Sequence, residues 1–465
     1  MTEAATERWD AVVVGAGPAG LAAATLLAEH RARVLLLDEQ PEPGGQIYRG
    51  IERAAPGGVR ARILGADYMH GAGLVGRFRA SSLAYQPQTS LWHVTPDLEL
   101  FVSRGGVAER LRASQLILAT GAMERAVPVP GWTLPGVMTA GALQILIKGS
   151  TLVPDRPVVL AGSGPLFYLL ANQCQAAGIP IAALLDSAAP RNLLAAAATL
   201  PRAMTGAGPG YLRKGFALMA KLRRAGIPTF RGVTDLEILG DDRVGAVRFR
   251  TRGRVHQLVA SLVALHEGVI PGQNATRMLG CDHVWDGRQF AFRPVLDDWG
   301  STSRHGIHVA GDAGGIVGAR AAEHQGRLVA LDVLSRLGRI DGATRDRQAL
   351  LDRRALAAHL AVRPLLDRLY PPPAAINLPA DDVIVCRCET VTAGQVRALA
   401  RQGLGPNQAK AALRCGMGPC QGRLCGTPVS QIVAAARFRP PEGSDYYNIR
   451  PPLKPISIGE ISTLG

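Results

Sequence analysis

Aromatic and charged residues are both scarce in this chain of 465 residues. Phe, Trp and Tyr make up 5% of the sequence, and Asp, Glu, Lys and Arg 19%. The 52 basic residues outnumber the 37 acidic ones and give a net charge of +15, but they are scattered and not gathered in blocks. Nucleic-acid binding needs basic clusters with interleaved aromatics, so this function is excluded. The arginine excess is most simply a proteome bias, although a basic surface also favours acidic partners or anionic lipid headgroups.

Long apolar runs are also missing. No uninterrupted run reaches the roughly 18 residues that a membrane-spanning helix needs. The first residues, MTEAATERWD, lack the basic and apolar regions of a secretory signal. We therefore expect a cytoplasmic protein, with peripheral attachment to the inner face of the cytoplasmic membrane left open. In a reducing compartment, clustered cysteines are more often metal ligands or redox groups than disulfides.

The N-terminal segment predicts a dinucleotide-binding βαβ unit. The strand-like run DAVVV (10–14) precedes GAGPAG, the helical pattern LAAATLLAEH and a second strand-like run that ends at Asp38. In a G-x-G-x-x-G turn the glycines permit a tight turn, close approach to a pyrophosphate and close helix packing. The helix amides then face the phosphates, and the acid accepts hydrogen bonds from a ribose hydroxyl. The expected binding residues of this unit are Gly15, Ala16, Gly17, Pro18, Ala19, Gly20, Asp38 and Glu39.

Two later segments indicate which dinucleotide is bound. QLILATGA (115–122) and GIHVAGDAGG (306–315) both read as buried strands, and the second ends at Asp312, which suits hydrogen bonding to a ribityl hydroxyl. This pattern resembles the two-dinucleotide-binding flavoproteins, whose FAD domain is built from both ends of the chain. The resemblance covers residues 10 to about 335 and implies FAD. The further flavin-binding residues expected are Gly45, Gln46, Arg49, Ala119, Thr120, Gly121, Gly311, Asp312 and Gly318.

A second βαβ unit begins between these segments at PVVLAGSGPLF (157–167). Gly162 and Gly164 keep two of the glycines, but Phe167 occupies the third position, where a bulky ring would push the helix from the strand or re-route the turn. Three interpretations stay open: the unit binds a nicotinamide nucleotide, it binds another adenine nucleotide, or it is vestigial.

Missing cysteines exclude disulfide reduction. No Cys precedes Cys174, so the pair that a glutathione-reductase-like enzyme would carry after Gly45 is absent, and the second unit has no C-x-x-C as in thioredoxin reductase. Cys174 lies in an apolar helical run and reads as a core thiol. Several acid–base side chains sit on apparent core elements, so none is assigned as catalytic: His266, Glu267, His308, Glu323 and His324.

Five of the seven cysteines fall in the last eighty or so residues. Cys386 and Cys388 in VCRCE, if they lie on a strand, point to the same side. Thr392 predicts the start of a short helix and Gly403 its end, and Pro406 starts another helix that ends near Gly416. Cys420 and Cys425 follow in a glycine-rich loop that exposes backbone amides. Thr427-Pro428 predicts a cap and first turn, so that the next helix starts beside Cys425.

Four thiolates with exposed amides suit an iron–sulfur cluster, which is held by Cys and tuned by hydrogen bonds to sulfur. Structural zinc is the alternative, although zinc sites favour C-x₂-C to C-x₄-C pairs over C-x-C. CRCE with GMGPCQGRLC resembles the bacterioferritin-associated-ferredoxin-like 2Fe-2S module. The resemblance implies the ligands Cys386, Cys388, Cys420 and Cys425, with C-x₄-C where that module usually has C-x₂-C, and it leaves Cys415 over.

Further motifs extend the resemblance over nearly the whole chain: DEQPEPGGQIYRG (38–50), GAMERAVPVPGWTLPGVMTAGALQ (121–144), GDAGGIVGARAAEHQGRLVA and RPPLKPISIGE. Together they are similar to the flavin and iron–sulfur subunit shared by opine oxidases, hydrogen cyanide synthase, hydroxyproline dehydrogenase and related heteromeric amino-acid dehydrogenases. This implies that a partner flavoprotein of the glycine or D-amino-acid oxidase type, with or without a small ferredoxin-like subunit, oxidises a C–N bond. The present chain would then carry the electrons to a respiratory-type acceptor.

The expected architecture is an α/β flavoprotein of two dinucleotide-binding domains with a small helical 2Fe-2S module. The expected boundaries are 1–125 with 263–340 for the FAD domain, 126–262 for the second domain, 341–379 for a helical segment and Pro-rich linker, 380–439 for the module and 440–465 for an extended tail. Two rival functions stay open: a self-sufficient NAD(P)H-dependent reductase, and a non-enzymatic docking subunit that holds structural zinc.

Overall fold

The first strand is buried on both faces, which places it in the middle of a sheet. In β1 (Arg8–Val14), Val12 packs into one core, whereas Ala11 and Val13 pack into another core on the opposite face. Successive strand side chains alternate between faces, so an apolar run such as AVVV needs cover on both sides. The computed structural model, which describes residues 8–150 and 153–464, pairs β1 in parallel with two neighbouring strands.

The sheet of this first domain has the order β3-β2-β1-β6-β5-β4, with β19 added beside β6. Strands β1, β2, β3, β6 and β19 are parallel, and β4, β5 and β6 form an antiparallel meander. The other bounds are Val34–Leu37 (β2), Ala84–Gln86 (β3), Thr89–Val94 (β4), Glu99–Arg104 (β5), Val107–Leu118 (β6) and Ile307–Val309 (β19).

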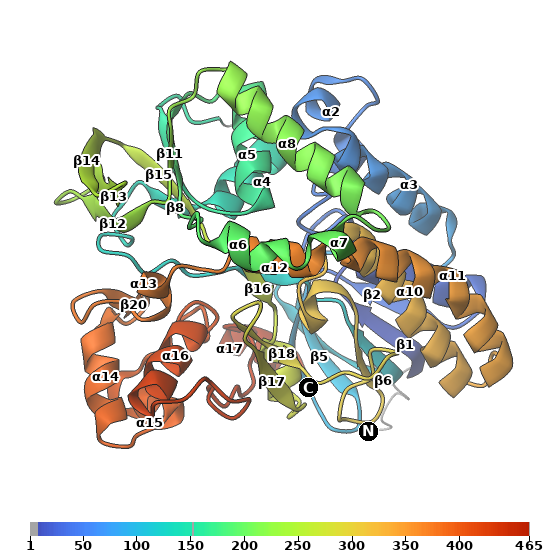
Figure 1. Ribbon diagram of the computed structural model, residues 1–465. Coiled ribbons are helices and arrows are strands. Elements are labelled where there is room, and N and C mark those ends of the chain that lie inside the picture. Colours follow the sequence, from blue (N-terminus) through green and yellow to red (C-terminus); the bar gives the residue numbers. More distant parts are fainter. Residues whose placement is uncertain (1–7, 151–152, 465) are drawn as a thin grey trace.

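Two long helices from opposite ends of this domain's sequence cover one face of the sheet. They are α1 (Pro18–Glu29) and α10 (Ala319–Arg336), which pack side by side because Gly326 lets the α10 backbone approach Ala19 (Figure 1). An N-terminal FAD-type unit is thus completed by a segment 300 residues later, as the sequence predicts. The remaining elements on this side are η1 (Ile51–Arg53), α2 (Val59–Leu64), α3 (Ala66–Ala80) and η2 (Gly311–Gly314).

The second domain contains a five-stranded parallel sheet of order β11-β10-β9-β15-β8 and a separate three-stranded antiparallel sheet, β12-β13-β14. Its strands are β8 (Val137–Thr139), β9 (Val158–Gly162), β10 (Ile181–Asp186), β11 (Thr229–Arg231), β12 (Thr234–Leu239), β13 (Ala246–Thr251), β14 (Arg254–Val259) and β15 (Leu262–His266). Its helices are α4 (Ala140–Gly149), α5 (Pro165–Ala176), α6 (Asn192–Ala197), α7 (Leu200–Ala203) and α8 (Gly208–Arg224).

Of the two expected effects of Phe167, a shifted helix start is not seen, whereas the turn does differ: Gly164 has a φ of +97°, where Gly17 of the first unit has a φ of −79°. Helix α5 starts one residue after Gly164, just as α1 starts one residue after Gly17. The Phe167 ring is 1% exposed and packs edge-on against Tyr168, with 5.2 Å between ring centroids. The ring therefore turns into the core of the domain instead of forcing the helix from its strand.

The chain crosses between the two domains at a short antiparallel strand pair, β7 (Ala122–Glu124) and β16 (Val269–Pro271). The expected boundary places the return to the first domain at residue 263. Because β15 still belongs to the sheet of the second domain, the chain returns to the first domain only at β16. After the return come α9 (Asn274–Met278) and the hairpin β17 (His283–Asp286) and β18 (Ala291–Pro294).

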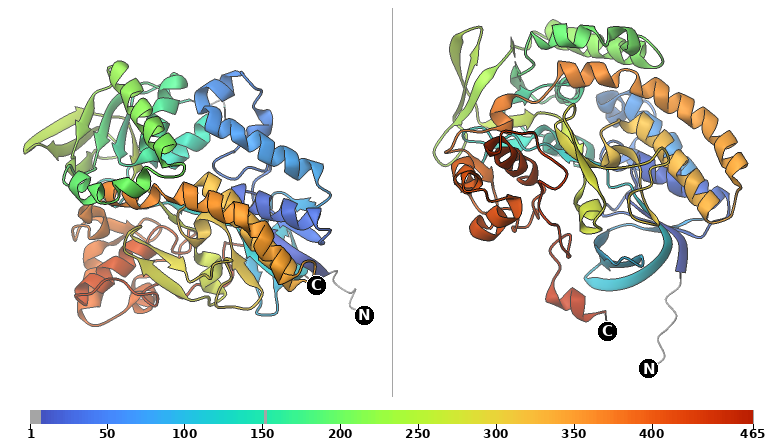
Figure 2. Two further views of the ribbon diagram at one scale, coloured as in Figure 1. Left: turned by 45° about the vertical axis from the view of Figure 1, so that its right-hand side comes forward. Right: turned by 60° about the horizontal axis from the view of Figure 1, so that its bottom comes forward.

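The C-terminal part begins with α11 (Gly342–Leu360), α12 (Arg363–Leu369) and α13 (Ala374–Asn377). The cysteine module, residues 380–439, then forms a separate lobe beneath the second domain (Figure 1; Figure 2, left). It contains β20 (Ile384–Cys386), β21 (Val391–Thr392), α14 (Ala393–Arg401), α15 (Pro406–Leu413) and α16 (Gly426–Ala436), and the tail ends in α17 (Ile458–Ser462).

Capping residues set the helix ends of the module largely as predicted. Thr392 caps α14 in a reciprocal capping box with Gln395, and Pro406 starts α15. The start of α16 differs from the prediction, because Cys425 and not Thr427 is the N-cap residue. No helix in the described ranges is long and apolar enough to cross a membrane.

Candidate functional site

The glycine turn after β1 has the close contacts that its sequence demands. A Cβ at Gly15 would lie 2.4 Å from the Ala119 carbonyl oxygen, and one at Gly20 only 1.8 Å from the Gly15 carbonyl oxygen. At Gly17, by contrast, the nearest atom outside its chain neighbours would be the Gly45 Cα at 3.9 Å. Gly17 is the N-cap of α1 and offers no side-chain cap, so the first-turn amides face a side that a phosphate can approach.

Asp38 follows β2 and holds this turn in place. Its Oδ2 accepts a hydrogen bond from the Ala16 amide at 2.5 Å, and its Oδ1 accepts one from the Gln40 amide at 2.7 Å. Burial raises the pKa of Asp38, and these two amides oppose the rise. A carboxylate has about four acceptor positions, so Asp38 can still accept bonds from ribose hydroxyls. The neighbouring Glu39 is more exposed and pairs with Lys454 of the tail.

Arg49 and Gln46 lie beside the turn, as the sequence predicts, and the guanidinium has a donor to spare. Arg49 Nη1 donates to Gln40 Oε1 at 2.7 Å and Nη2 to Gln46 Oε1 at 3.1 Å. Its buried Nε has no partner among the described residues. A buried donor without a partner is costly, and it fits a binding site for an anionic ligand.

Sequence reasoning missed Lys148, which supports this loop from α4. Its Nζ donates to the Gln46 carbonyl oxygen and to Gln144 Oε1, both at 3.0 Å, and its side chain is buried. Burial first, and then the charge of Arg49, lowers the pKa of Lys148 to about 7. The only sequence signal was a single cation after the apolar run ILI (145–147).

The later flavin-binding candidates meet the first turn from the other side. A Cβ at Gly311 would lie 2.8 Å from the Ala19 Cβ, so the end of β19 touches the start of α1. Asp312 Oδ1 accepts hydrogen bonds from the amides of Val317 and Gly318, at 2.8 and 2.9 Å, and thereby shapes the entry to α10. Thr120 donates to the Gly272 carbonyl oxygen at 3.0 Å, and a Cβ at Gly121 would point into open space.

The acid–base candidates all have structural partners. His308 is buried against Gln115, and His324 pairs with Asp352. Glu323 accepts from His70 at 2.8 Å and from Arg77 at 3.2 Å. His266 Nδ1 lies 2.5 Å from Glu124 Oε1.

Glu267 directly follows β15 and contacts the glycine turn of the second domain, where a pyrophosphate would bind in a dinucleotide-binding unit. Its carboxylate accepts hydrogen bonds from Ser163 at 3.1 Å and Ser187 at 2.6 Å. Asp186, at the end of β10 where a ribose would be bound, accepts from the Tyr168 hydroxyl at 2.6 Å. The Tyr370 side chain comes within 4.0 Å of a Cβ placed on Gly164. Side chains of Glu267 and Tyr370 thus lie against the turn at which a nucleotide would bind in such a unit.

We expect Glu267 to give folding a specific pH dependence, because burial raises its pKa from 4.5 to about 7. The folded state therefore binds a proton that the unfolded state has released between these values. This contribution is complete below pH 4.5 and is lost as the pH rises through 7, a loss of roughly 3 kcal/mol. Urea unfolding from pH 5 to 8 should show this slope in the native chain and not in Glu267→Gln. The exposed control Glu109→Gln should keep it; an equal slope in Glu267→Gln would contradict the expectation.

The cysteine module gathers four thiols from two segments, but not on one strand. β20 ends at Cys386, and Cys388 lies in the turn that follows, so the prediction that both are strand residues is wrong at Cys388. The turn brings Cys388 against the second segment, since a Cβ at Gly418 would lie 2.3 Å from the Cys388 Cβ. Cys386 and Cys425 are buried, Cys420 is partly buried and Cys388 is exposed.

The four thiols interact with each other and with backbone amides. A hydrogen bond from Cys425 is the main reason that the pKa of Cys386 falls to about 6 and that of Cys420 to about 5. Amides of Gly416 and Glu389 act on Cys386 in the same direction, and those of Leu424 and Gly422 on Cys420. The pKa of Cys388 is raised, mainly by burial, and that of Cys425 is raised by its hydrogen bonds to Cys386 and Cys420. The metal-binding thiolate form is therefore favoured at Cys386 and Cys420 alone. No group of three or more His, Cys, Asp or Glu in the described ranges is arranged as a metal site, so 2Fe-2S binding stays a prediction.

The fifth thiol of the region, Cys415, is held by the tail. The Tyr447 hydroxyl donates to Cys415 Sγ at 3.4 Å and lies 3.6 Å from Cys425 Sγ. The Tyr447 ring fits over Gly416 and Gly422, where a Cβ would come within 2.7 Å of it. No sequence signal indicated this contact, because the tail was predicted only to extend along the body.

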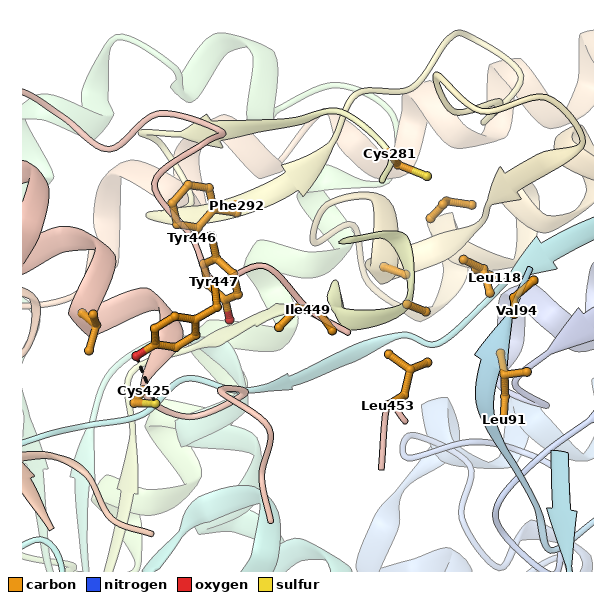
Figure 3. Packing of buried hydrophobic residues seen from close by; sticks show 14 of the residues in the cluster. Leu91, Val94, Leu118, Cys281, Phe292, Cys425, Tyr446, Tyr447, Ile449 and Leu453 are labelled. Carbon is orange, nitrogen blue, oxygen red and sulfur yellow. Dashed lines mark hydrogen bonds between the residues drawn. The ribbon is translucent and has the colours of Figure 1, made fainter. Parts of the chain in front are cut away.

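One continuous apolar core joins the module to the first-domain sheet. The cluster includes Leu118 and Val94 of the sheet, Phe292 of β18, Tyr446 of the tail and Cys425 of the module (Figure 3). Arg277 lies over the rings of Tyr446 and Phe292, 4.1 and 4.8 Å from their centroids. The module is therefore packed on the body and not merely tethered to it.

The fold and the first-domain turn define an FAD-binding oxidoreductase of the pyridine nucleotide-disulphide oxidoreductase class, whose family model matches residues 9–326. L-Proline dehydrogenase from P. horikoshii superimposes with a TM-score of 0.68 and 20% identity over 98% of this chain and 79% of that one. Thioredoxin reductase from T. acidophilum gives 0.51 and 18% over 71% of this chain and 99% of that one. At such identities the likeness concerns the fold alone, and only the first extends over the C-terminal part.

Two curated relatives define the family more narrowly. The A-type subunit of opine oxidase from Rhizobium meliloti (strain 1021) is 49% identical over 460 residues, which is 98% of this chain and 99% of that protein. Hydrogen cyanide synthase subunit HcnB of Pseudomonas protegens is 34% identical over 96% of both chains. The chain belongs to the family of the A-type opine oxidase subunits, and the expected resemblance to opine oxidase and hydrogen cyanide synthase subunits is confirmed.

Proposed function

We propose that this chain is the electron-transferring subunit of a heteromeric dehydrogenase that oxidises a C–N bond of an amino acid, an opine or a related amine. The names of its relatives, an opine oxidase subunit and a hydrogen cyanide synthase subunit, support the amine class and the heteromeric state. When bound, FAD takes up two electrons together and a 2Fe-2S cluster passes electrons singly, so the pair would convert two-electron oxidation into single-electron flow.

The residues of the first domain fit FAD. The free first-turn amides of α1, the unpartnered Arg49 Nε and the Asp38 carboxylate offer the donors and acceptors that a pyrophosphate and a ribose require. Asp312 and Gly318 would face the ribityl and ring portion. These residues would bind and orient FAD. We assign none of them as the base that removes a proton from a substrate.

The observation that carries the proposal is the packing of Cys386 and Cys425 into the same core as the first-domain sheet, with Cys420 partly buried and Cys388 exposed. Cys386, Cys388, Cys420 and Cys425 would hold the 2Fe-2S cluster, and the surrounding amides would donate to its sulfurs. A fixed contact between the two parts suits electron transfer within one chain. A separate flavoprotein of the glycine or D-amino-acid oxidase type would remove the electrons from the amine, with or without a small ferredoxin-like subunit.

The second domain would act as a scaffold in this scheme. Glu267 would place a carboxyl group beside a bound pyrophosphate, and the Tyr370 side chain lies within 4.0 Å of a Cβ placed on Gly164. These contacts argue against the self-sufficient NAD(P)H-dependent reductase and against binding of any other adenine nucleotide. We accordingly expect that NADH and NADPH leave the flavin absorbance of the purified chain unchanged.

The test is an anaerobic preparation of the chain with the subunits that co-purify from its native host. We expect about equal amounts of FAD and 2Fe-2S cluster per chain, and dye reduction with at least one member of a panel of amino acids and opines only when the partner is present. Zinc in place of iron would favour the docking subunit, flavin bleaching by NADH would favour the reductase, and amine oxidation by the isolated chain would overturn the division of labour.

A further inference from the structure

A stretch of the second domain combines basic residues with a complete lack of acidic ones. From residue 187 to residue 234 the sequence contains no Asp and no Glu. The same stretch forms α6, α7 and α8, which lie on the outside of the molecule and make up its upper edge in one view (Figure 2, right). Its basic residues are Arg191, Arg202, Arg213, Lys214, Lys221, Arg223, Arg224 and Arg231.

These helices also expose large apolar side chains. Leu194 is 83% exposed, and Phe216 and Leu193 are 66% and 65% exposed. Leu200 in α7 and Met204 at its end are also exposed, at 46% and 55%. We call the combined set the α6–α8 surface: apolar Leu193, Leu194, Leu200, Met204 and Phe216, with basic Arg191, Arg202, Arg213, Lys221, Arg223 and Arg224.

The exposed apolar side chains of α8 are not core residues left uncovered, because another side of this helix already packs on the domain core. Its inner side is provided by Leu222, with Leu218 and Met219, and packs on α5. Phe216 points the other way, and the spacing of three and eight residues places Arg213 and Arg224 on the same outer face. Phe216 is therefore an apolar anchor between two cations, on a helix whose core contacts are already made.

The cations of the α6–α8 surface are not neutralised by the chain. Across the described residues, Lys214 is the member of this stretch that forms an ion pair, with Asp67. The six basic residues of the surface itself form none in the same part of the chain. Their fields therefore add and attract an anionic partner.

We propose that the α6–α8 surface docks on an anionic lipid headgroup layer. Interfacial helices carry Lys and Arg on their polar side and Phe and Leu on the side that enters the acyl boundary. Long cationic side chains can reach the phosphates while the apolar ones insert. An acidic protein is the other partner that this charge could attract, and the experiment distinguishes the two. The proposal does not depend on the substrate or cofactors of the chain.

Sedimentation of the purified complex with vesicles tests this. We expect several-fold more protein bound to phosphatidylcholine vesicles with about 30% phosphatidylglycerol than to pure phosphatidylcholine, and release by salt. Arg213→Ser with Arg224→Ser should weaken binding about fivefold for each arginine removed. Leu194→Glu with Phe216→Glu should abolish it. Phe438→Glu is the matched control, because Phe438 is 99% exposed but lies at the end of α16 in the cysteine module.

Unchanged FAD content and circular dichroism would show that the variants fold. Binding of the native complex to neither vesicle, or equal loss in Phe438→Glu, would overturn the proposal. Loss of a co-purifying subunit in Leu194→Glu with Phe216→Glu, without any vesicle binding by the native complex, would assign the surface to a protein partner and would also overturn it. Amine oxidation does not enter the measurement, so failure here leaves the proposed function untouched.

Discussion

Replacing Cys420 by Ser is expected to strip the chain of iron while leaving its flavin in place. Serine keeps the shape of the side chain, and Cys420 is only partly buried, so the packing of the module should survive. What is lost is a thiolate that the Cys425 hydrogen bond and the amides of Leu424 and Gly422 favour. Loss of supporting groups around metal ligands alone costs about 10- to 100-fold in metal affinity, and loss of a ligand should cost more. Iron and sulfide analysis and the electron paramagnetic resonance spectrum of the dithionite-reduced chain measure the effect.

Cys415→Ser is the matched control for this substitution. Cys415 is a buried thiol of the same loop, but its contact is the Tyr447 hydroxyl and it stands outside the expected ligand set. The variant should therefore keep its iron. Loss of iron from Cys415→Ser with retention in Cys420→Ser would show that the ligand set is wrong, and iron-free preparations of the native chain would remove the cluster altogether.

Gly20→Ala is expected to abolish FAD retention. The added Cβ would lie 1.8 Å from the Gly15 carbonyl oxygen and 3.0 Å from its carbon, and a backbone cannot give way as a side chain can. Helix α1 must move from β1, which takes its first-turn amides away from the pyrophosphate site. We expect a loss of free energy of unfolding of about 3 kcal/mol or more and a protein purified almost without flavin. Flavin absorbance per chain and urea unfolding provide the readouts.

Gly76→Ala supplies the comparison. Gly76 is exposed on α3, and a Cβ there would meet nothing within 4 Å. Since alanine favours helix over glycine by roughly 0.5–1 kcal/mol, this variant should be as stable as the native chain or more so, with full flavin content. If Gly20→Ala kept its flavin equally well, the close packing of the turn would not be what positions the cofactor.

The first domain could be read from the sequence because the spacing of its glycines and of Asp38 belongs to a recurring βαβ pattern. Gly15 and Gly20 permit close backbone contacts that a larger side chain would prevent, and Asp38 and Asp312 accept hydrogen bonds from backbone amides. The same holds for Thr392 and Pro406, whose caps and first-turn positions are read directly from the sequence.

The contacts missed by sequence reasoning join distant segments. Tyr447 reaches Cys415 from the tail, and Lys148 reaches Gln46 from another domain. The expected displacement of the helix by Phe167 is wrong for a similar reason, because a core that the local pattern does not describe accepts the ring. Cys388 left the expected strand because the chain turns directly after Cys386. Such outcomes depend on tertiary packing, which local propensities and spacing do not encode.

The shared core of sheet, tail and cysteine module has a consequence for how the molecule comes apart. Excising residues 380–439 as an independent miniature protein would strip Val429 and Ile432 from the other members of their cluster, among them Tyr446 of the tail and Phe292 of β18. We therefore expect the lobe that looks separable in outline (Figure 2) to melt together with the body of the molecule, as one cooperative unit.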